Sequence, residues 1–184
     1  MNKVIISVLG PDGPGIIAMV AKILFACECN IENVSQTILQ NEFSGIFIVS
    51  TPADLSTGAL SSRLKEGLAP LRQHSFIKSL STEGSGFDTT SSEPFVITTR
   101  GPDQKGLVAR ITEVIARHGV NVTNLQAIFK GGDNPGDNIM IYEVDVPPET
   151  DSEKLQQDLR TKSDELGLTI SIQHRRIFET INRV

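Results

Sequence analysis

The sequence GPDGPG, residues 10–15, follows a β-rich run and precedes a helical pattern, and a near copy, GPDQKG, stands at residues 101–106. A shift of 91 positions aligns residues 10–34 with 101–125, with 7 identities in 25 positions. Further along, an offset of 95 aligns the leucines of a second helical pattern, which are Leu60, Leu64 and Leu71 in the first copy and Leu155, Leu159 and Leu166 in the second. The repeat predicts two like domains, residues 1–82 and 94–184.

The segment between the copies has a different composition. Residues 81–93 read STEGSGFDTTSSE, with Phe87 as their one apolar residue. A composition of this kind predicts a flexible linker, which we place at residues 83–93. The four residues that change the offset from 91 to 95 fall in residues 131–138, a Gly, Asp, Asn and Pro cluster that predicts a longer turn.

Each copy shows the same order of patterns: strand, helix, strand, strand, helix, strand. In the first copy we expect strands at 3–9, 30–39, 45–51 and 75–80, helices from Gly15 and from 52–54, and a turn at 42–44. In the second copy we expect strands at 95–100, 120–129, 139–146 and 168–178, helices at 107–117 and 153–166, and a capping box at 150–153. This order predicts an α+β protein of two ferredoxin-like βαββαβ domains, each an antiparallel four-stranded sheet with two helices on one face.

Composition and charge narrow the function classes. The formal net charge is −5, which disfavours general binding to nucleic acid or to an anionic membrane. Apolar runs stay far below the roughly 20 residues of a membrane span, and no signal peptide is visible after Met1. Cys27 and Cys29 are too close together for a comfortable disulfide, and the histidines are scattered. We therefore expect a cytoplasmic protein with reduced cysteines near a helix end and no metal or cofactor.

The motif could belong to a phosphate-binding loop. A P-loop reads G-x-x-x-x-G-K-[ST], and Gly10 and Gly15 have its separation. However, the lysine that would contact the phosphates is replaced by Ile16, and by Leu107 in the copy. This absence disfavours a P-loop.

The motif could also be a dinucleotide-binding fingerprint. Residues 13–18, GPGIIA, match G-x-G-x-x-A as a string, but the copy has Gln104 in place of Gly13. A domain of about ninety residues with a hairpin after its second strand also leaves no room for a doubly wound sheet. The match is therefore weak.

A third interpretation needs no phosphate. The chain turns tightly, with Gly15 permitting close backbone approach, and a helix begins at about Gly13. Asp12 caps that helix or accepts hydrogen bonds from its backbone N–H groups. The helix N-terminus could instead hold a ligand's carboxylate, with Asp12 and Asn30 as acceptors for an ammonium group. The residues alone leave a helix cap and an amino-acid site equally open.

At these residues the sequence resembles the ACT domain family. That family's pattern is a strand, D-x-P-G-hydrophobic opening a helix, and Asn-Ile or Asn-Val entering the second strand. The first copy has it at residues 12–16 and 30–31, and the second at 103–107 and 121–122, where Lys105 replaces the proline. Two copies filling nearly all of the sequence, with CECNIENV at 27–34, are similar to the glycine cleavage system transcriptional repressor group.

The resemblance implies ligand sites at an interface between two ACT domains, because the two halves of the motif should lie at opposite ends of one domain. We expect Asp12 to pair with Asn121 and Asp103 with Asn30, within one chain or in a homodimer. Lys105 either opposes the helix dipole or helps to hold an anion, so we expect the two sites to differ. The expected ligand-binding residues are Gly10, Asp12, Gly13, Gly15, Ile16, Asn30, Ile31, Gly101, Asp103, Gln104, Gly106, Leu107, Asn121 and Val122.

No nucleophile, base and orienting group recur in both copies, so we do not expect an enzyme. The leading hypothesis is a regulatory protein that binds a small amino acid and acts on a protein partner, including in transcriptional regulation of amino-acid metabolism. The rival is a dimerisation or docking scaffold without a ligand. Direct DNA binding is disfavoured, because the single basic cluster, residues 174–176, is more simply a solvated strand face.

Overall fold

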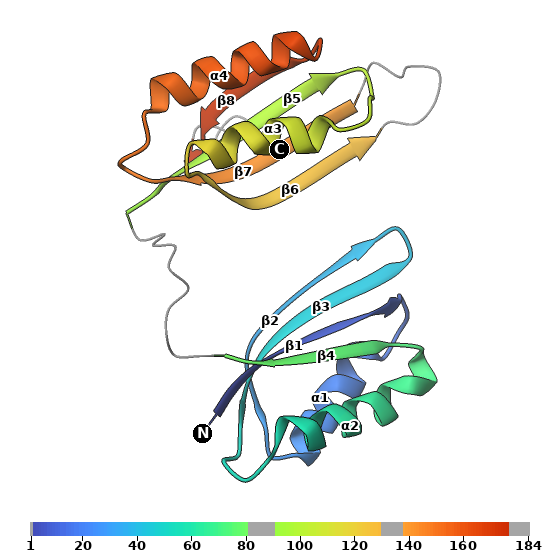
Figure 1. Cartoon of the computed structure of the whole chain (residues 1–184). Helices are drawn as coiled ribbons and strands as arrows, with labels where there is room; N and C mark the ends of the chain where they lie inside the picture. The colour runs from blue at the N-terminus through green and yellow to red at the C-terminus, as the bar shows by residue number, and fades with distance from the viewer. Residues whose placement is uncertain (1, 81–90, 130–137, 177–184) are drawn as a thin grey trace. The chain divides into compact units, whose positions relative to one another are not determined.

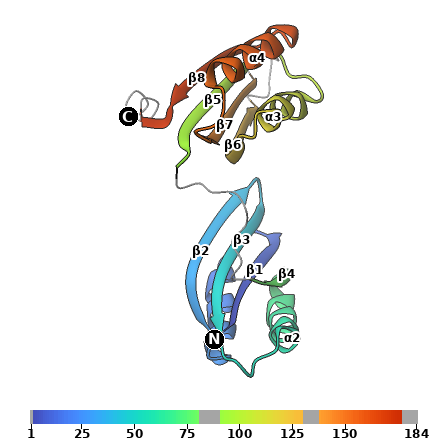
Figure 2. The same cartoon turned by 60° about the vertical axis from the view of Figure 1, so that its left-hand side comes forward.

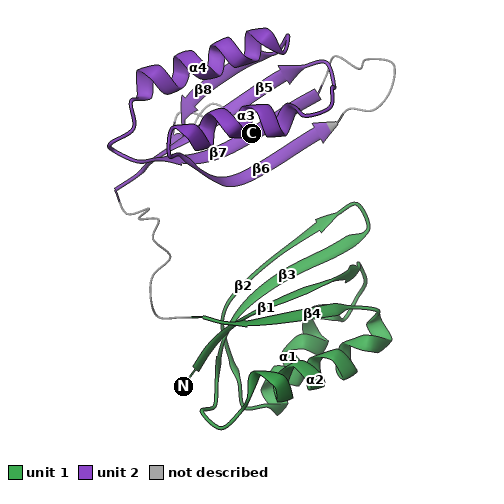
Figure 3. Ribbon diagram, viewed as in Figure 1, with its two compact units in different colours: residues 1–84 green, residues 85–184 purple. Residues whose placement is uncertain are grey.

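The computed structural model describes residues 2–80, 91–129 and 138–176. The chain divides into two compact units, residues 1–84 and 85–184 (Figure 3). The segment 81–90, which holds most of the predicted linker, lies outside the described residues, as do residues 131–137 of the turn predicted at 131–138. The last residue of that predicted turn, Asn138, is instead the first residue of strand β7. Glu93, predicted to close the linker, is the first residue of strand β5.

Both units have the predicted order of elements (Figure 1). Unit 1 contains β1 (Asn2–Pro11), α1 (Ile16–Ala26), β2 (Asn30–Leu39), β3 (Glu42–Thr51), α2 (Thr57–Leu68), a 3-10 turn η1 (Ala69–Leu71) and β4 (His74–Ser79). Unit 2 contains β5 (Glu93–Gly101), α3 (Leu107–Arg117), β6 (Asn121–Phe129), β7 (Asn138–Val146), α4 (Ser152–Glu165) and β8 (Thr169–His174). The ferredoxin-like α+β prediction is confirmed for both halves.

Several predicted boundaries are wrong. The strand expected at 168–178 ends at His174, and Arg175 and Arg176 are helical, while residues 177–178 lie outside the described residues. Residues 42–44, where a turn was expected, belong to β3. The chain reverses just before them, at Gln40, whose φ is 56°. Helix α2 does not open at 52–54: its N-cap is Ser56, whose hydroxyl accepts from the Ala59 N–H at 3.1 Å. The cap of α4 is Asp151, accepting from Lys154 N–H at 3.0 Å, whereas the predicted capping box began at Thr150.

The two sheets have equivalent antiparallel topologies, β2-β3-β1-β4 and β6-β7-β5-β8. In each unit the two helices cover one face of the sheet, as the two views together show (Figures 1 and 2). The residues of β1 and β3 alternate between this covered face and the other, so that Val4, Ile6, Val8, Phe43, Phe47 and Val49 are buried against the helices. The central strands β1 and β5 end in the two motif loops.

The helix-facing core of unit 2 is more polar than that of unit 1. At positions equivalent in the repeat, Thr99 stands for Val8, Tyr142 for Phe47, Asn138 for Phe43 and Ser163 for Leu68. All eight residues are buried. A buried polar group costs free energy unless it is hydrogen-bonded. The polar residues in the core of unit 2 therefore need an explanation that the apolar residues of unit 1 do not.

Tyr142 is the only tyrosine of the chain and is fully buried. Its hydroxyl donates to Met140 Sδ at 3.2 Å. Burial raises the pKa of Tyr142 to about 12, against a smaller lowering by a hydrogen bond with Thr99. The phenol thus stays protonated in the folded unit at a pH where an unfolded chain, with a tyrosine pKa near 10, has lost the proton.

The free energy of unfolding of unit 2 is therefore expected to fall as pH rises from about 10 to about 12, and to be independent of this group below that window. Denaturant titrations across the window, compared with those of Tyr142→Phe, isolate the effect, since the variant keeps every other titrating group. Tyrosinate absorbance with a midpoint near 10 in the folded chain would contradict the expectation.

Candidate functional site

The motif loop of unit 1 joins the end of β1 to the start of α1. Gly15 is the N-cap residue, with φ 93° and ψ −4°, and no side chain caps the helix. The Asp12 backbone N–H donates to the Asn41 carbonyl at 2.8 Å. The predicted helix cap by Asp12 is therefore wrong, as is a helix start at Gly13, because a left-handed residue separates the aspartate from the first turn.

The loop of unit 2 repeats this backbone. Gly106 has φ 86° and ψ 8°, α3 begins at Leu107, and no side chain caps it. Asp103 Oδ1 accepts a long hydrogen bond from Asn138 Nδ2, at 3.4 Å. Asp103 is thus linked to the first residue of β7 rather than to the helix that follows it.

The first turns of α1 and α3 are suited to bind an anion. The first N–H groups of an α-helix have no partner within the helix, and neither helix has an acidic residue in its first turn or a side-chain cap. The positive end of the helix dipole adds to their attraction for a carboxylate. Both loops place an exposed aspartate a few residues before these N–H groups.

Gly10 is required for close packing against the segment after η1. A Cβ built on Gly10 would lie 2.7 Å from the Arg72 carbonyl oxygen and 2.8 Å from Gln73 Nε2. Gln73 is buried, and its Nε2 donates to the carbonyls of Pro11, at 2.7 Å, and Leu71, at 3.2 Å. Its Oε1 is buried without a partner. Sequence reasoning missed Gln73, because nothing local to it marks the contact.

In unit 2 a hydrogen bond also joins the corresponding loops, but its donor lies in the motif loop. Gln104, in the motif loop, donates through Nε2 to the Leu166 carbonyl at 2.7 Å. Leu166 is the repeat equivalent of Leu71, while Gln104 corresponds to Gly13. The side-chain amide of Gln104, which was predicted to bind ligand, is therefore engaged within the unit.

The asparagines of the motif lie at the other end of each sheet. Asn30 is opposite Ser50, which pairs with Lys3 at the start of β1, whereas Pro11 pairs with Glu42. In unit 2 Asn121 is opposite Asp145, and Gly101 is opposite Asn138. Neither unit brings its own aspartate and motif asparagine together, as the topology predicted.

Both asparagines precede a similar irregularity in an edge strand. The register shifts between Ile31 and Asn33 and between Val122 and Asn124. A β-bulge of this kind re-aims the neighbouring side chains. Asn121 and Val122 also line an open hollow of about 590 Å³ against the 109–116 face of α3.

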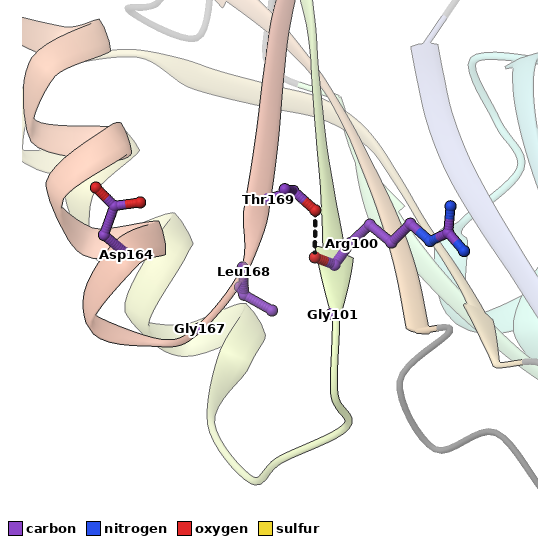
Figure 4. Close-up of a pocket in the computed structure, with 6 residues that line it drawn as sticks. All are labelled: Arg100, Gly101, Asp164, Gly167, Leu168 and Thr169. Atoms are coloured by element: carbon purple, nitrogen blue, oxygen red, sulfur yellow. Dashed lines mark hydrogen bonds between the residues drawn. The ribbon is translucent and has the colours of Figure 1, made fainter.

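A second open hollow, of about 510 Å³, lies where β5 ends and β8 begins (Figure 4). Gly101 of the motif lines it, and Thr169 Oγ1 donates to the Arg100 carbonyl at 3.0 Å across it. Asp164 borders it from α4, and the Arg100 side chain extends away from Asp164. The predicted residues Gly101, Asn121 and Val122 thus line two separate hollows of unit 2.

The cysteines lie where they were predicted, at a helix end. Cys27 is the buried C-cap residue of α1, and Cys29 is partly buried. Arg63 Nη1 donates to Cys27 Sγ at 3.3 Å. Burial is the largest cause that raises the pKa of the Cys29 thiol. Within residues 2–80, 91–129 and 138–176, no three His, Cys, Asp or Glu side chains gather so that they could hold a metal ion.

The basic cluster at 174–176 does not form an open cationic face. Arg175 Nη2 forms an ion pair with Glu143 Oε2 at 2.6 Å. The His174 ring packs edge-on against the Phe95 ring, with 5.3 Å between the ring centroids. Among the helices that the structure describes, none is long and apolar enough to cross a membrane.

The family model of the ACT domain matches residues 2–75 and 93–173. The chain belongs to the ACT domain family. The two matches coincide with the two repeats found in the sequence, so this ACT protein carries the domain in tandem.

Curated relatives of this ACT protein have about the length of one unit. A UPF0237 protein of Methanosarcina mazei is 33% identical over 96 residues, which are 51% of this chain and 99% of the relative. The UPF0237 protein MK1213 of Methanopyrus kandleri is 36% identical over 67 residues, 36% of this chain and 74% of the relative.

Two solved structures share the fold over both ACT domains. A protein of unknown function from Galdieria sulphuraria has a TM-score of 0.75 at 23% identity, covering 94% of this chain and 98% of its own. A candidate glycine cleavage system transcriptional repressor has a TM-score of 0.66 at 18% identity, covering 94% and 96%.

Proposed function

We propose that this tandem ACT protein is a non-enzymatic regulator that binds a small free amino acid and acts on a protein partner. The observation that carries the proposal is the repeated loop, which puts an exposed carboxylate beside an uncapped helix N-terminus. A zwitterion carries the complementary pair of charges. Its carboxylate accepts from the first-turn N–H groups, and its ammonium group faces the aspartate.

The site needs a second domain to complete it. Each loop lies at the end of the sheet opposite to its own motif asparagine. We propose that two ACT domains pair so that Asp103 and Asn30 serve one ligand and Asp12 and Asn121 the other, within one chain or between two copies. Binding would then favour one arrangement of the domains and change the surface offered to the partner.

Surface chemistry of unit 1 supports association of domains. Helix α1, IIAMVAKILFA, carries a single charged residue, Lys22. Its Phe25 is 84% exposed, and Leu39 at the end of edge strand β2 is 76% exposed. A helix with so few polar residues is normally covered on both sides.

A fold relative supports a proposal for the regulated process. The structure named as a candidate glycine cleavage system transcriptional repressor covers both units of this chain. We propose a cytoplasmic role of the same type, in transcriptional regulation of amino-acid metabolism through a protein that itself contacts DNA. The net charge of −5 fits an indirect role, since it disfavours DNA binding by this chain.

Isothermal titration calorimetry of the full chain with each of the twenty amino acids tests the proposal. We expect one or a few small amino acids to bind, and their N-acetyl and carboxamide derivatives to bind at least tenfold more weakly, because each derivative lacks one of the two charges. The absence of heat and of any thermal stabilisation with all twenty would contradict amino-acid binding.

A scaffold without a ligand is the second candidate, favoured by the exposed apolar residues of α1. In that case Phe25→Ser would change the oligomeric state in sedimentation, and no amino acid would raise the thermal midpoint. A thermal shift that depends on the aspartates would contradict the scaffold.

A further inference from the structure

Asn138 is a buried polar residue with an unsatisfied hydrogen-bond acceptor. It is 5% exposed at the first position of β7, and its Oδ1 has no hydrogen-bond partner. Its repeat equivalent in unit 1 is Phe43, which is 2% exposed and packs in the apolar core. The Phe43 ring lies over Gly45, where a Cβ would come within 2.7 Å of it, whereas unit 2 has the buried Met140 at the position of Gly45. Packing thus explains why the ring is absent from unit 2, but not why the residue that replaces it carries an amide with an unpartnered oxygen.

The Asn138 side chain points at the motif loop. Its Nδ2 donates to Asp103 Oδ1 at 3.4 Å, and the unpartnered Oδ1 belongs to the same amide. The Asp103 carboxylate therefore lies beside the amide that carries the unpartnered oxygen. Both are acceptors, so their missing partner is a donor, and a positively charged donor suits the carboxylate.

The first turn of α3 supplies the opposite chemistry beside this pair. Gly106 turns the chain in the left-handed conformation, so that uncapped N–H groups follow Asp103 by a few residues. Lys105 is exposed between them. Acceptors for a cation and donors for an anion are thus arranged within one loop and its neighbouring strand.

Unit 1 lacks this arrangement. Phe43 stands at the position of Asn138, so no amide is present there. Gln73 also has an unpartnered Oε1, but its Nε2 donates to the carbonyls of Pro11 and Leu71 and not to an acid. We infer that Asp103 and Asn138 together bind the ammonium group of the amino-acid ligand, which makes unit 2 the principal ligand-binding unit. This inference rests on the function proposed above. It adds the orientation of the bound amino acid and names the unit that binds it.

The test compares Asn138→Ala, which deletes the amide, with the wild-type chain. The probes are the amino acid that gives the largest calorimetric heat among the twenty and its N-acetyl derivative. We expect the amino acid to bind about tenfold to a hundredfold more weakly to the variant, as for loss of a hydrogen bond to a charged group. Affinity for the N-acetyl derivative, which has a carboxylate but no ammonium group, should change much less, so the variant should no longer prefer the free amine.

Two further variants control for packing. Ser163→Ala removes a different unpartnered buried polar atom of unit 2, a hydroxyl oxygen on α4, and should bind as the wild type does. Asn138→Leu also removes the amide but keeps a side chain of similar size, so it replaces Asn138→Ala if the latter does not fold. Wild-type affinity and amine preference in the folded Asn138 variant would overturn the inference. An absence of binding by the wild-type chain would instead overturn the proposed function and with it this assignment.

Discussion

Replacing Asp103 by asparagine is expected to weaken amino-acid binding by at least tenfold while leaving the thermal midpoint within a few degrees. The substitution removes the negative charge that balances the ligand's ammonium group, and a hydrogen bond to a charged group contributes about 1.5–3 kcal/mol. Fold stability should not suffer, because Asp103 does not cap α3, and an asparagine oxygen still accepts from Asn138 Nδ2.

Asp164→Asn is the matched control for this prediction. Asp164 is an exposed acid of the same unit, beside the hollow at the end of β5, and it does not belong to the motif loop. Calorimetry should give it wild-type affinity. Equal losses in both variants would mean that net charge, rather than a positioned carboxylate, governs binding.

Gly10→Ala is expected to destabilise unit 1 by about 2–3 kcal/mol, the cost of inserting a methyl group into a packed site. The new Cβ would lie 2.7 Å from the Arg72 carbonyl oxygen, a backbone atom that cannot rotate away as a side-chain atom can. The displacement would also disturb the hydrogen bond from Gln73 Nε2 to the Pro11 carbonyl. Chemical denaturation monitored by far-ultraviolet circular dichroism measures the effect.

The same loop offers a control for the glycine prediction. Gly13→Ala places a Cβ with no atom within 4 Å, so its stability should stay within about 1 kcal/mol of the wild type. Gly101→Ala should lie between the two, because its nearest contact, at 2.6 Å, is the side-chain atom Leu168 Cδ2, and its nearest backbone contact, the Gly167 carbonyl oxygen, is at 3.0 Å. A Gly10→Ala chain as stable as Gly13→Ala would show that the loop and Gln73 are not packed together.

Local patterns were sufficient for most of the fold. The predicted limits of the second strand and of the helix at 107–117 agree with β2 and α3 to the residue. The start of β3 was missed because Glu42 and Ser44 are turn-like residues. Between them Phe43 is buried against the helices, and this tertiary contact keeps the segment extended.

The candidate site could be predicted only in part. The motif itself marks both loops, since it repeats with its glycines in place, and the topology places each asparagine at the far end of its sheet. Asn138 and Gln73 could not be predicted, because each contacts its loop through a side-chain hydrogen bond to a residue far away in the sequence. Comparing the copies residue by residue gives one usable signal, the polar Asn138 in place of an apolar Phe43.

Nuclear magnetic resonance of the chain labelled with [15N]glycine tests the central claim most directly. The chain has 15 glycines, and Gly106 and Gly15 report the two motif loops, while Gly58 and Gly67 in α2 serve as internal references. On titration with the amino acid that gives the largest calorimetric heat, we expect the Gly106 amide resonance to move and saturate with the calorimetric dissociation constant. Saturable binding that leaves both Gly106 and Gly15 unmoved would contradict the account.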